Sequence, residues 1–202
     1  NPEEDFEVYV VNTHENPVDQ QPTKVAGKLN RQTGVLEKEQ SLVLNYQQLK
    51  SYHQGSAYRV LLNQPEDYTG YRYLKMYVHG PDNPENILFF LRLGADSSNY
   101  YEYHTTLHPG WDEQNEVNID FDQITALKAY ARNNRPSASV ASIDTTAGPY
   151  RVKGNPTLTQ IRWFSVGVVN MDTVYFQPVT GEVWVDEMRV TDARKEKGIA
   201  GS

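Results

Sequence analysis

The sequence LFFLRLGADSSNYYEYHTTL, residues 88–107, has the pattern of two β-strands joined by a turn. Alternate positions from Ile87 to Leu93 are apolar, whereas Arg92 lies on the other face of the first strand. On the returning strand, Glu102 and His104 alternate with tyrosines. The polar run between the strands favours a turn, because such residues adopt positive φ or hydrogen-bond their own backbone. The stretch therefore predicts an antiparallel hairpin with an apolar face toward a core and a face of Tyr, Arg, Glu and His outward.

The rest of the chain predicts an all-β fold. Strand-like alternation occurs in Asp5–Asn12, Glu39–Leu49, Tyr58–Asn63, Tyr71–His79, Glu116–Phe121, Gln160–Asn170 and Glu182–Asp192. One short helix is predicted with Asp122 as N-cap, because Ile124, Leu127 and Ala131 are spaced for one buried stripe. Ser137–Pro149 is rich in Ser, Thr and Ala and predicts a loop. We therefore predict an antiparallel β-sandwich of the jelly-roll, galactose-binding-like kind with one short helix.

The same pattern suggests three stretches of chain. Residues 39–192 form the predicted sandwich, and residues 1–38 add a strand and a polar, proline-containing arm to the same domain. Residues 193–202 are polar and predict a linker or tail. In a jelly roll, the first and last strands are expected to lie close together.

Charge and composition exclude several classes of function. The net charge is −7, so nucleic acid is not an expected partner, because phosphate binding needs clustered Lys and Arg. Cysteine is absent, which removes disulfides, thiolate metal sites and cysteine nucleophiles. No apolar run approaches the roughly 20 residues that a membrane-spanning helix needs.

The outward face of the hairpin is the candidate binding surface. If the strand Tyr71–His79 lies beside the hairpin, tyrosines of both combine with hydrogen-bonding groups, an arrangement that stacks on sugars or binds protein. The candidate ligand-binding residues are Tyr71, Tyr73, Tyr77, Arg92, Tyr100, Glu102, His104 and Trp111. A purely structural explanation also holds, because cross-strand tyrosine pairs stabilise a sheet by roughly 0.2–1 kcal/mol each.

Two pairs of residues were considered as metal ligands. His104 and His108 are four residues apart, roughly 13 Å along a strand, which is too far for one zinc ion. A structural calcium is the better candidate, with Glu7 and Asp186 supplying carboxylate oxygens from the terminal strands.

The sequence contains no recognisable catalytic motif. Carboxylates such as Glu102, Asp112 and Asp120 could pair as acid and base, but nothing in the sequence sets their separation. There is no G-x-S-x-G elbow and no phosphate-binding glycine loop. We predict that the chain is not an enzyme, and keep a jelly-roll glycoside hydrolase or lyase as a remote alternative.

Six segments occur in an order and spacing typical of a known family. They are EQSLVL (39–44), YRYLKMYVHG (71–80), LFFLRLGADSSNYYEYHTTL (88–107), NEVNIDFDQITALK (115–128), GNPTLTQIRWFSVGVVN (154–170) and GEVWVDEMRVTD (181–192). Together they resemble a region of the SprA/Sov family, the outer-membrane translocons of the type IX secretion system. The resemblance covers residues 39–192 and includes the family's "RLGSD…NYYEYE" and "VWVNELRLTD" stretches, which match 92–104 and 183–192.

This resemblance implies a non-catalytic domain of a protein in the envelope of a Gram-negative bacterium. The domain is expected to be associated with the outer membrane, periplasmic or on the cell surface, and to act in protein export or gliding motility. Its expected partners are other domains of a larger outer-membrane protein or secreted passenger proteins. Because family members are far longer than this chain, the resemblance implies an excised segment or a stand-alone relative. The ending and the aromatic content also resemble jelly-roll carbohydrate-binding modules, so a polysaccharide ligand is the alternative.

Overall fold

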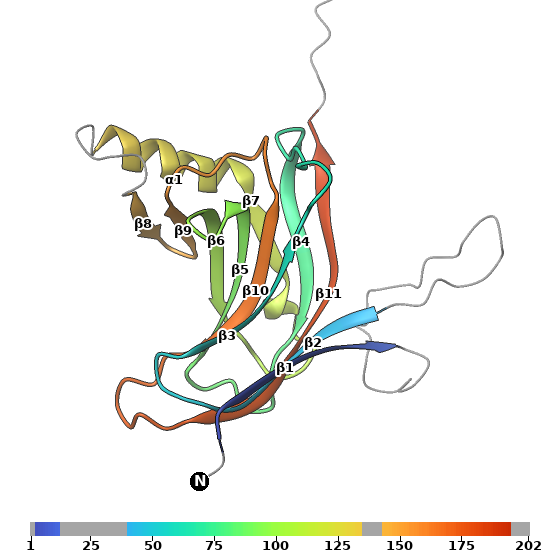
Figure 1. Ribbon diagram of the computed structural model, residues 1–202, viewed down its shortest axis with the longest axis vertical. Helices are drawn as coiled ribbons and strands as arrows, with labels where there is room; N and C mark the ends of the chain where they lie inside the picture. The colour runs from blue at the N-terminus through green and yellow to red at the C-terminus, as the bar shows by residue number, and fades with distance from the viewer. Residues whose placement is uncertain (1–2, 13–39, 135–142, 195–202) are drawn as a thin grey trace, which may run out of the picture.

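The protein folds as two packed β-sheets with one α-helix beside them (Figure 1). The computed structural model describes residues 3–12, 40–134 and 143–194. The elements are β1 (Asp5–Asn12), β2 (Gln40–Leu49), β3 (Gln54–Val60), β4 (Tyr71–His79), β5 (Ile87–Asp96), β6 (Asn99–Thr106), a 3-10 helix (Glu113–Asn115), β7 (Val117–Asp120), α1 (Phe121–Asn133), β8 (Asp144–Ala147), β9 (Tyr150–Lys153), β10 (Trp163–Asn170) and β11 (Val179–Ala193). One sheet has the order β1-β2-β11-β4-β7 and the other β3-β10-β5-β6-β9-β8. The paired strands run antiparallel, so the predicted β-sandwich is confirmed.

The predicted hairpin is β5–β6. Its register pairs Arg92 with Glu102, so both side chains lie on the outward face as expected. A register shift between Gly94 and Asp96 precedes the turn. Gly94 is required there, because a Cβ at this position would lie 2.1 Å from the carbonyl oxygen of Asn99.

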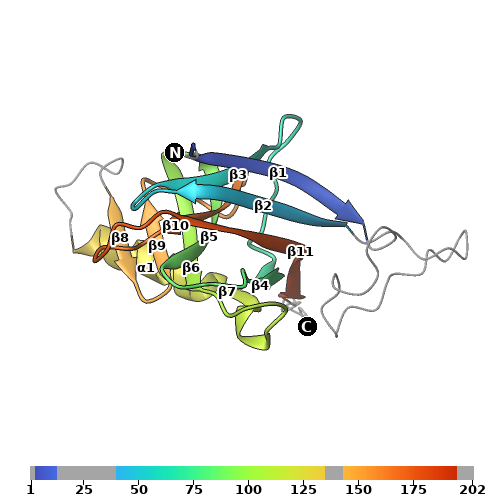
Figure 2. The ribbon, with the colours of Figure 1, turned by 90° about the horizontal axis from the view of Figure 1, so that it is seen from below.

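β1, β2 and β11 run side by side as long strands of the five-stranded sheet (Figure 2). The first and last strands therefore share a sheet, with β2 between them. β11 also pairs with β4, and a β-bulge interrupts this pairing between Asp186 and Arg189. Within the bulge Glu187 has a φ of 47°, a conformation that non-glycine residues adopt rarely.

The core lies between the two sheets. It joins Leu74, Met76 and Val78 of β4 to Phe89, Leu91 and Leu93 of β5, each no more than 1% exposed. These are the inward positions that the period-two pattern predicts. Burial of each such side chain stabilises the fold by about 1.5–3 kcal/mol.

The helix α1 closes the side of the sandwich next to β7, β8 and β9. Ile124 and Ala131 are buried and Leu127 is half-buried, which confirms the predicted stripe. The N-cap is Asp120 rather than Asp122, because the chain leaves β7 in extended conformation at Asp120 and its carboxylate accepts the Asp122 N–H at 2.9 Å.

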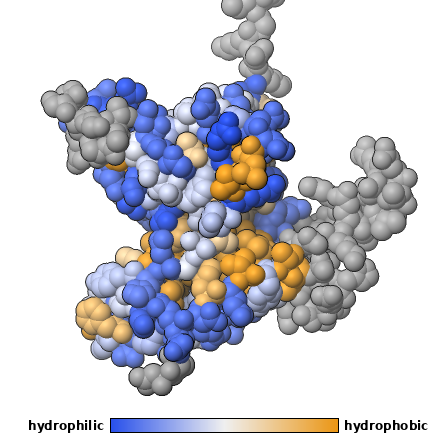
Figure 3. Space-filling model, viewed as in Figure 1, coloured by the Kyte–Doolittle hydropathy of each residue, from blue (hydrophilic) through white to orange (hydrophobic). Residues whose placement is uncertain are grey.

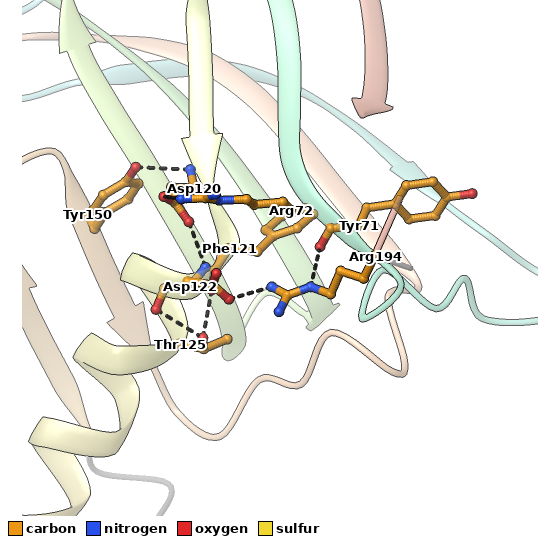
Figure 4. A network of polar contacts seen from close by, with 8 residues as sticks. All are labelled: Tyr71, Arg72, Asp120, Phe121, Asp122, Thr125, Tyr150 and Arg194. Atoms are coloured by element: carbon orange, nitrogen blue, oxygen red, sulfur yellow. Dashed lines mark hydrogen bonds and ion pairs between the residues drawn. The ribbon is translucent and has the colours of Figure 1, made fainter. Parts of the chain in front are cut away.

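Polar contacts at the start of α1 tie the helix to both sheets (Figure 4). Arg194, at the end of β11, pairs with Asp122 and donates to the carbonyl oxygen of Tyr71 at 3.2 Å. The Asp120 N–H donates to the hydroxyl of Tyr150 on β9 at 3.1 Å. Because β9 and β11 belong to different sheets, this network links the two layers.

Two parts of the fold differ from the sequence prediction. The predicted loop Ser137–Pro149 contains β8, which pairs with β9 around a turn where Gly148 has a φ of 56°. These strands have four residues each, too few for a periodic signal, and β9 forms by pairing with β6. β3 begins at Gln54 rather than Tyr58.

The predicted polar arm after β1 falls on residues 13–39, and the predicted tail falls largely on residues 195–202, all outside the described residues. Among the residues that are described, no helix combines the length and apolar character needed to cross a membrane.

Candidate functional site

The predicted binding residues lie on opposite outer faces of the sandwich. Tyr71, Tyr73 and Tyr77 belong to β4 of the five-stranded sheet. The remaining hairpin residues, Arg92, Tyr100, Glu102 and His104, belong to β5 and β6 of the six-stranded sheet. The condition for one joint surface, that β4 lies beside the hairpin, is therefore not met: β4 pairs with β11 and β7, and the core separates it from β5.

The aromatic rings near β4 are held by neighbouring side chains. The Arg189 guanidinium lies 4.9 Å from the ring centre of Tyr77 and donates to its hydroxyl at 3.2 Å. His79 stacks on Trp184 with 5.3 Å between ring centres and meets Trp111 edge-on at 5.2 Å. Trp111 therefore lies with His79 and Trp184, on the side of β4 and not beside the hairpin.

A buried ion network occupies the outward face of the hairpin. The Glu102 side chain is 7% exposed, and its Oε2 lies 2.5 Å from Arg92 Nε and 3.8 Å from Arg151 Nη1. Two hydrogen bonds from Arg151 to Asp144, at 2.7 and 2.8 Å, raise the pKa of Arg151. His104 Nδ1 lies 3.5 Å from Glu102 Oε1. Since these groups pair with one another, the network has a structural explanation that needs no ligand.

An aromatic row on this same face was missed by the sequence analysis. Tyr58 of β3 is 73% exposed and pairs with Ser165 of β10, next to the half-buried Trp163 on the same face. The Trp163 and Tyr100 rings lie 5.8 Å apart, and they meet over Gly94, which has no side chain to separate them. Alternation within residues 160–170 places Trp163 and Ser165 on the same face of the strand. That this face points outward follows only from the pairing of β10 with β3 and β5.

Three carboxylates considered for acid–base catalysis have structural partners. Asp112 accepts the Gln114 N–H at 2.8 Å, and Asp120 caps α1. Glu102 belongs to the ion network with Arg92. Each carboxylate therefore has a structural role that explains its presence.

An apolar cleft of about 610 Å³ opens between the sheets on the side of β1 and β3. Its walls include Val8, Leu42 and Met188 from one sheet and Ala57 and Val166 from the other. Its floor reaches Met76 and Leu91, which are both fully buried at 0% exposure. Figure 3 shows apolar surface on both sides of the narrower middle part of the molecule. The cleft therefore lies directly over core side chains, at an edge of the sandwich away from α1.

Charged groups surround this apolar surface. The cleft is lined by Arg59 and by three carboxylates, Glu66, Asp186 and Glu187. Glu187 pairs with Arg189 at 3.3 Å, so one negative charge remains in excess when all five groups are ionised. Glu66 accepts a hydrogen bond from the Tyr68 hydroxyl at 2.5 Å. An apolar ligand with flanking positive charge fits such a cleft best.

Glu7 and Asp186, the predicted calcium pair, lie too far apart to share an ion. Glu7 pairs with Asn45 of β2, and Asn45 pairs with Glu182 on β11, four residues before Asp186. Four residues span roughly 13 Å along a strand, whereas calcium ligands lie about 2.3–2.6 Å from the ion. Within the ranges that the structure describes, no three acidic or histidine side chains gather as a metal site.

Asp186 has an unusual environment that gives a pH prediction. It is 5% exposed, and its Oδ2 is buried without a hydrogen-bond partner, while Oδ1 accepts the Glu187 N–H at 2.8 Å. Burial raises the pKa of the Asp186 carboxyl, and the nearby Glu187 charge raises it too, whereas the Glu187 N–H and the Ser41 hydroxyl lower it. The folded state therefore holds the proton more tightly than the unfolded state.

Because the folded-state pKa is raised, the protonated Asp186 carboxyl contributes to the free energy of unfolding at low pH. This contribution is lost as the pH rises through the folded-state pKa. We expect Asp186→Asn to increase the free energy of unfolding by about 1 kcal/mol at pH 7, because the buried group is then uncharged. The gain should shrink at pH 4 and below. Urea unfolding at both pH values measures it, and a lower stability of the variant at pH 7 would contradict the assignment.

The solved structures similar to this sandwich include a carbohydrate-binding module and an agarase. The family 11 carbohydrate-binding module from Clostridium thermocellum, in complex with a β-1,3-1,4-mixed-linked tetrasaccharide, has a TM-score of 0.50 and 12% identity over 95% of this chain and 86% of that chain. An exo-β-agarase has a TM-score of 0.50 and 12% identity over 96% of this chain but only 24% of the agarase. At such identity the likeness concerns the fold alone. A search of curated protein sequences returns no match.

The fold thus places the chain among jelly-roll β-sandwiches of the kind seen in carbohydrate-binding modules. Residues 2–202 match the SprA_N family, described as motility related/secretion protein, and the chain belongs to this family. The resemblance drawn from the six sequence segments is confirmed at this level.

Proposed function

We propose that the chain is a non-catalytic binding domain of a secretion or motility protein of the cell envelope, and that its cleft holds an extended apolar polypeptide segment. The observation that carries this proposal is the opening between the sheets, which reaches Met76 and Leu91 of the core. The segment comes from another part of a larger outer-membrane protein or from a passenger protein.

The chemistry of the cleft supports a polypeptide ligand. Val8 and Met188 remain 42% and 46% exposed, so an apolar segment that covers them removes apolar surface from water. Each Å² so removed contributes roughly 25 cal/mol. The surplus of carboxylates at the cleft favours a segment that carries Lys or Arg beside its apolar residues.

The sheet edges offer a second source of affinity. In the part of the chain that the structure describes, β1 is an edge strand of one sheet and β3 an edge strand of the other. The unpaired backbone groups of an edge strand can bond an added strand, while pockets beside it receive alternate side chains.

Binding can be measured with a fluorescent ten-residue peptide that alternates leucine and serine, which carries no side-chain charge that an added carboxylate could attract. We expect saturable binding that Met188→Glu weakens about tenfold or more, since it puts another negative charge against an apolar ligand, equivalent to about 1.4 kcal/mol. Met171→Glu is the matched control, because Met171 is similarly exposed at 43% but does not line the cleft. Equal weakening by both variants, or no binding of the peptide, would refute the proposal.

A polysaccharide is the second candidate ligand. It is supported by the row of Tyr58, Trp163 and Tyr100 on the six-stranded sheet, in which the exposed ring of Tyr58 and the half-buried ring of Trp163 can stack on sugars. Tyr58 and Trp163 are better probes than Tyr100, which is only 4% exposed.

Affinity electrophoresis in gels that contain a panel of polysaccharides, mixed-linked β-glucan among them, tests this candidate. If it holds, retardation in one gel should be lost in Tyr58→Ala and Trp163→Ala. It should persist in Tyr130→Ala, whose ring is 63% exposed on α1. Unretarded migration of the wild-type protein in every gel would rule out this ligand class.

A further inference from the structure

The connection between β10 and β11 carries an exposed apolar tip, formed by Met171, Val174, Tyr175 and Phe176. Val174, Tyr175 and Phe176 are 70%, 74% and 61% exposed. Tyr52, itself 58% exposed, lies beside the tip with its ring centre 6.4 Å from that of Phe176. The connection lies at the end of the sandwich opposite α1 (Figure 1), and apolar atoms protrude at this corner in Figure 3. Contiguous exposed apolar side chains of this kind are typical of interaction sites.

A buried carboxylate holds the tip in shape. Asp172 is 3% exposed, and its Oδ1 accepts the N–H groups of Val174 and Tyr175, each at 3.0 Å. Its Oδ2 accepts the N–H of Gln177 at 2.9 Å. These bonds, that of Tyr175 foremost, lower the pKa of Asp172, so the carboxylate is ionised at neutral pH. The turn is therefore ordered by its own backbone and not by contacts of the exposed rings.

A second layer of bonds fastens this turn to the body of the protein. Asn170 is fully buried, accepts the Asp172 N–H at 2.9 Å and donates to the carbonyl oxygens of Leu49 and Gln177 at 2.9 and 2.8 Å. The Ser51 hydroxyl donates to the carbonyl oxygen of Asp172. These buried polar groups hold the backbone of the turn while its apolar side chains stay in water, so the tip is already ordered before any partner binds.

The backbone of the tip points to the same conclusion. Phe176 has a φ of +53°, an unfavourable conformation for a bulky residue. Such strain persists where the surroundings over-determine it, and it is common at binding sites.

The surroundings of the tip indicate what kind of partner it meets. In the adjacent turn, Lys50 and His53 both pair with Glu4, at 3.7 and 2.9 Å. Asp172 lies at the base of the same turn, so two carboxylates, Glu4 and Asp172, stand against Lys50 and His53. The described groups beside the tip therefore give no surplus of positive charge, which an anionic lipid surface would favour. Together the aromatic side chains of Tyr52, Tyr175 and Phe176 expose roughly 400 Å². That is about half of the roughly 800 Å² that each partner buries in a stable interface, so a protein that binds the tip must also contact the groups around it.

We propose that the apolar tip is a docking knob that inserts into a preformed apolar pocket on a folded protein partner. Tyr175 and Phe176 are the anchors, and the Glu4 ion pairs form part of the polar rim. This contact surface is separate from the cleft and does not depend on the function proposed for the cleft.

Photo-cross-linking in the producing cells tests the proposal on the full protein that contains this chain. Benzoylphenylalanine in place of Tyr175 should yield an adduct that maps to one apolar pocket of a folded protein, and a polar substitution in that pocket should abolish it. The same probe in place of Tyr130, at the other end of the sandwich, is the exposure-matched control. An adduct no stronger than that of the control, or one to lipid or to a second copy of the chain, would overturn the proposal.

Two variants separate the tip from the cleft and from folding. Phe176→Ser should reduce the adduct about tenfold, whereas Met188→Glu in the cleft should leave it unchanged. Asp172→Ala keeps every apolar side chain of the tip but removes the carboxylate that holds the turn, so it should reduce the adduct as well. In parallel, the purified domain should not float with vesicles of phosphatidylethanolamine and phosphatidylglycerol. Flotation that Phe176→Ser abolishes would show a lipid-binding tip instead.

Discussion

Glu102→Leu is expected to destabilise the domain by about 3–5 kcal/mol, because it leaves the buried Arg92 guanidinium without its carboxylate. The Arg92 side chain is 15% exposed, and Glu102 is its 2.5 Å partner. Arg151 keeps a carboxylate in Asp144, so Arg92 is the cation left uncompensated. Urea unfolding monitored by tryptophan fluorescence gives the difference in free energy of unfolding.

The double variant Arg92→Leu/Glu102→Leu should recover most of this loss. Replacement of a whole buried ion pair by apolar side chains is often neutral or stabilising, whereas removal of one partner is costly. Arg92 also lies 3.9 Å over the Phe90 ring, so its leucine replacement loses part of that contact. If the two single losses simply add in the double variant, the pair is not coupled and the network is not what stabilises this face.

Phe89→Ala should cost about 3–5 kcal/mol, since it removes a fully buried ring and leaves a cavity between the sheets. For a domain of this size, that loss lowers the melting temperature by roughly 10 °C. Differential scanning calorimetry measures the shift.

Phe176→Ala is the matched control for this prediction. It removes the same ring from a position that is 61% exposed, so the stability change should stay within about 0.5 kcal/mol. The pair of variants separates the ring that holds the fold together from the ring that we assign to a partner. A large loss of stability in Phe176→Ala would mean that the tip is part of the folding core.

Much of the candidate surface could not be predicted because strand alternation is a local property. It placed Tyr77 and Arg92 outward, which is right for both. It did not show that β4 lies across the core from the hairpin, because sheet order depends on contacts between residues far apart in the chain. The row of Tyr58, Trp163 and Tyr100 went unnoticed for the same reason, since its members come from three different strands.

The cleft has no signature in the sequence at all. Its floor residues Met76 and Leu91 have the alternation of ordinary core positions, and they are buried as expected. The cleft forms where the edges of the two sheets are not bridged by a helix, as they are beside α1. The exposed tip has no signature either, because its residues are apolar and adjacent in sequence. Hydrogen bonds to the buried Asp172 and Asn170 hold the turn that keeps them outside.

The sequence alone determined the all-β class, the inward faces of β4 and of the hairpin of residues 88–107, the stripe of the helix and the family. These follow from period-two and 3.6-residue patterns, from turn chemistry and from segments in fixed order, all of which act over short distances along the chain. Only the tertiary structure decided which strands are neighbours, which short strands form at an edge, where the sandwich stays open and which apolar side chains remain in water. Those outcomes depend on pairing and packing between distant residues, whose free energy no local pattern contains.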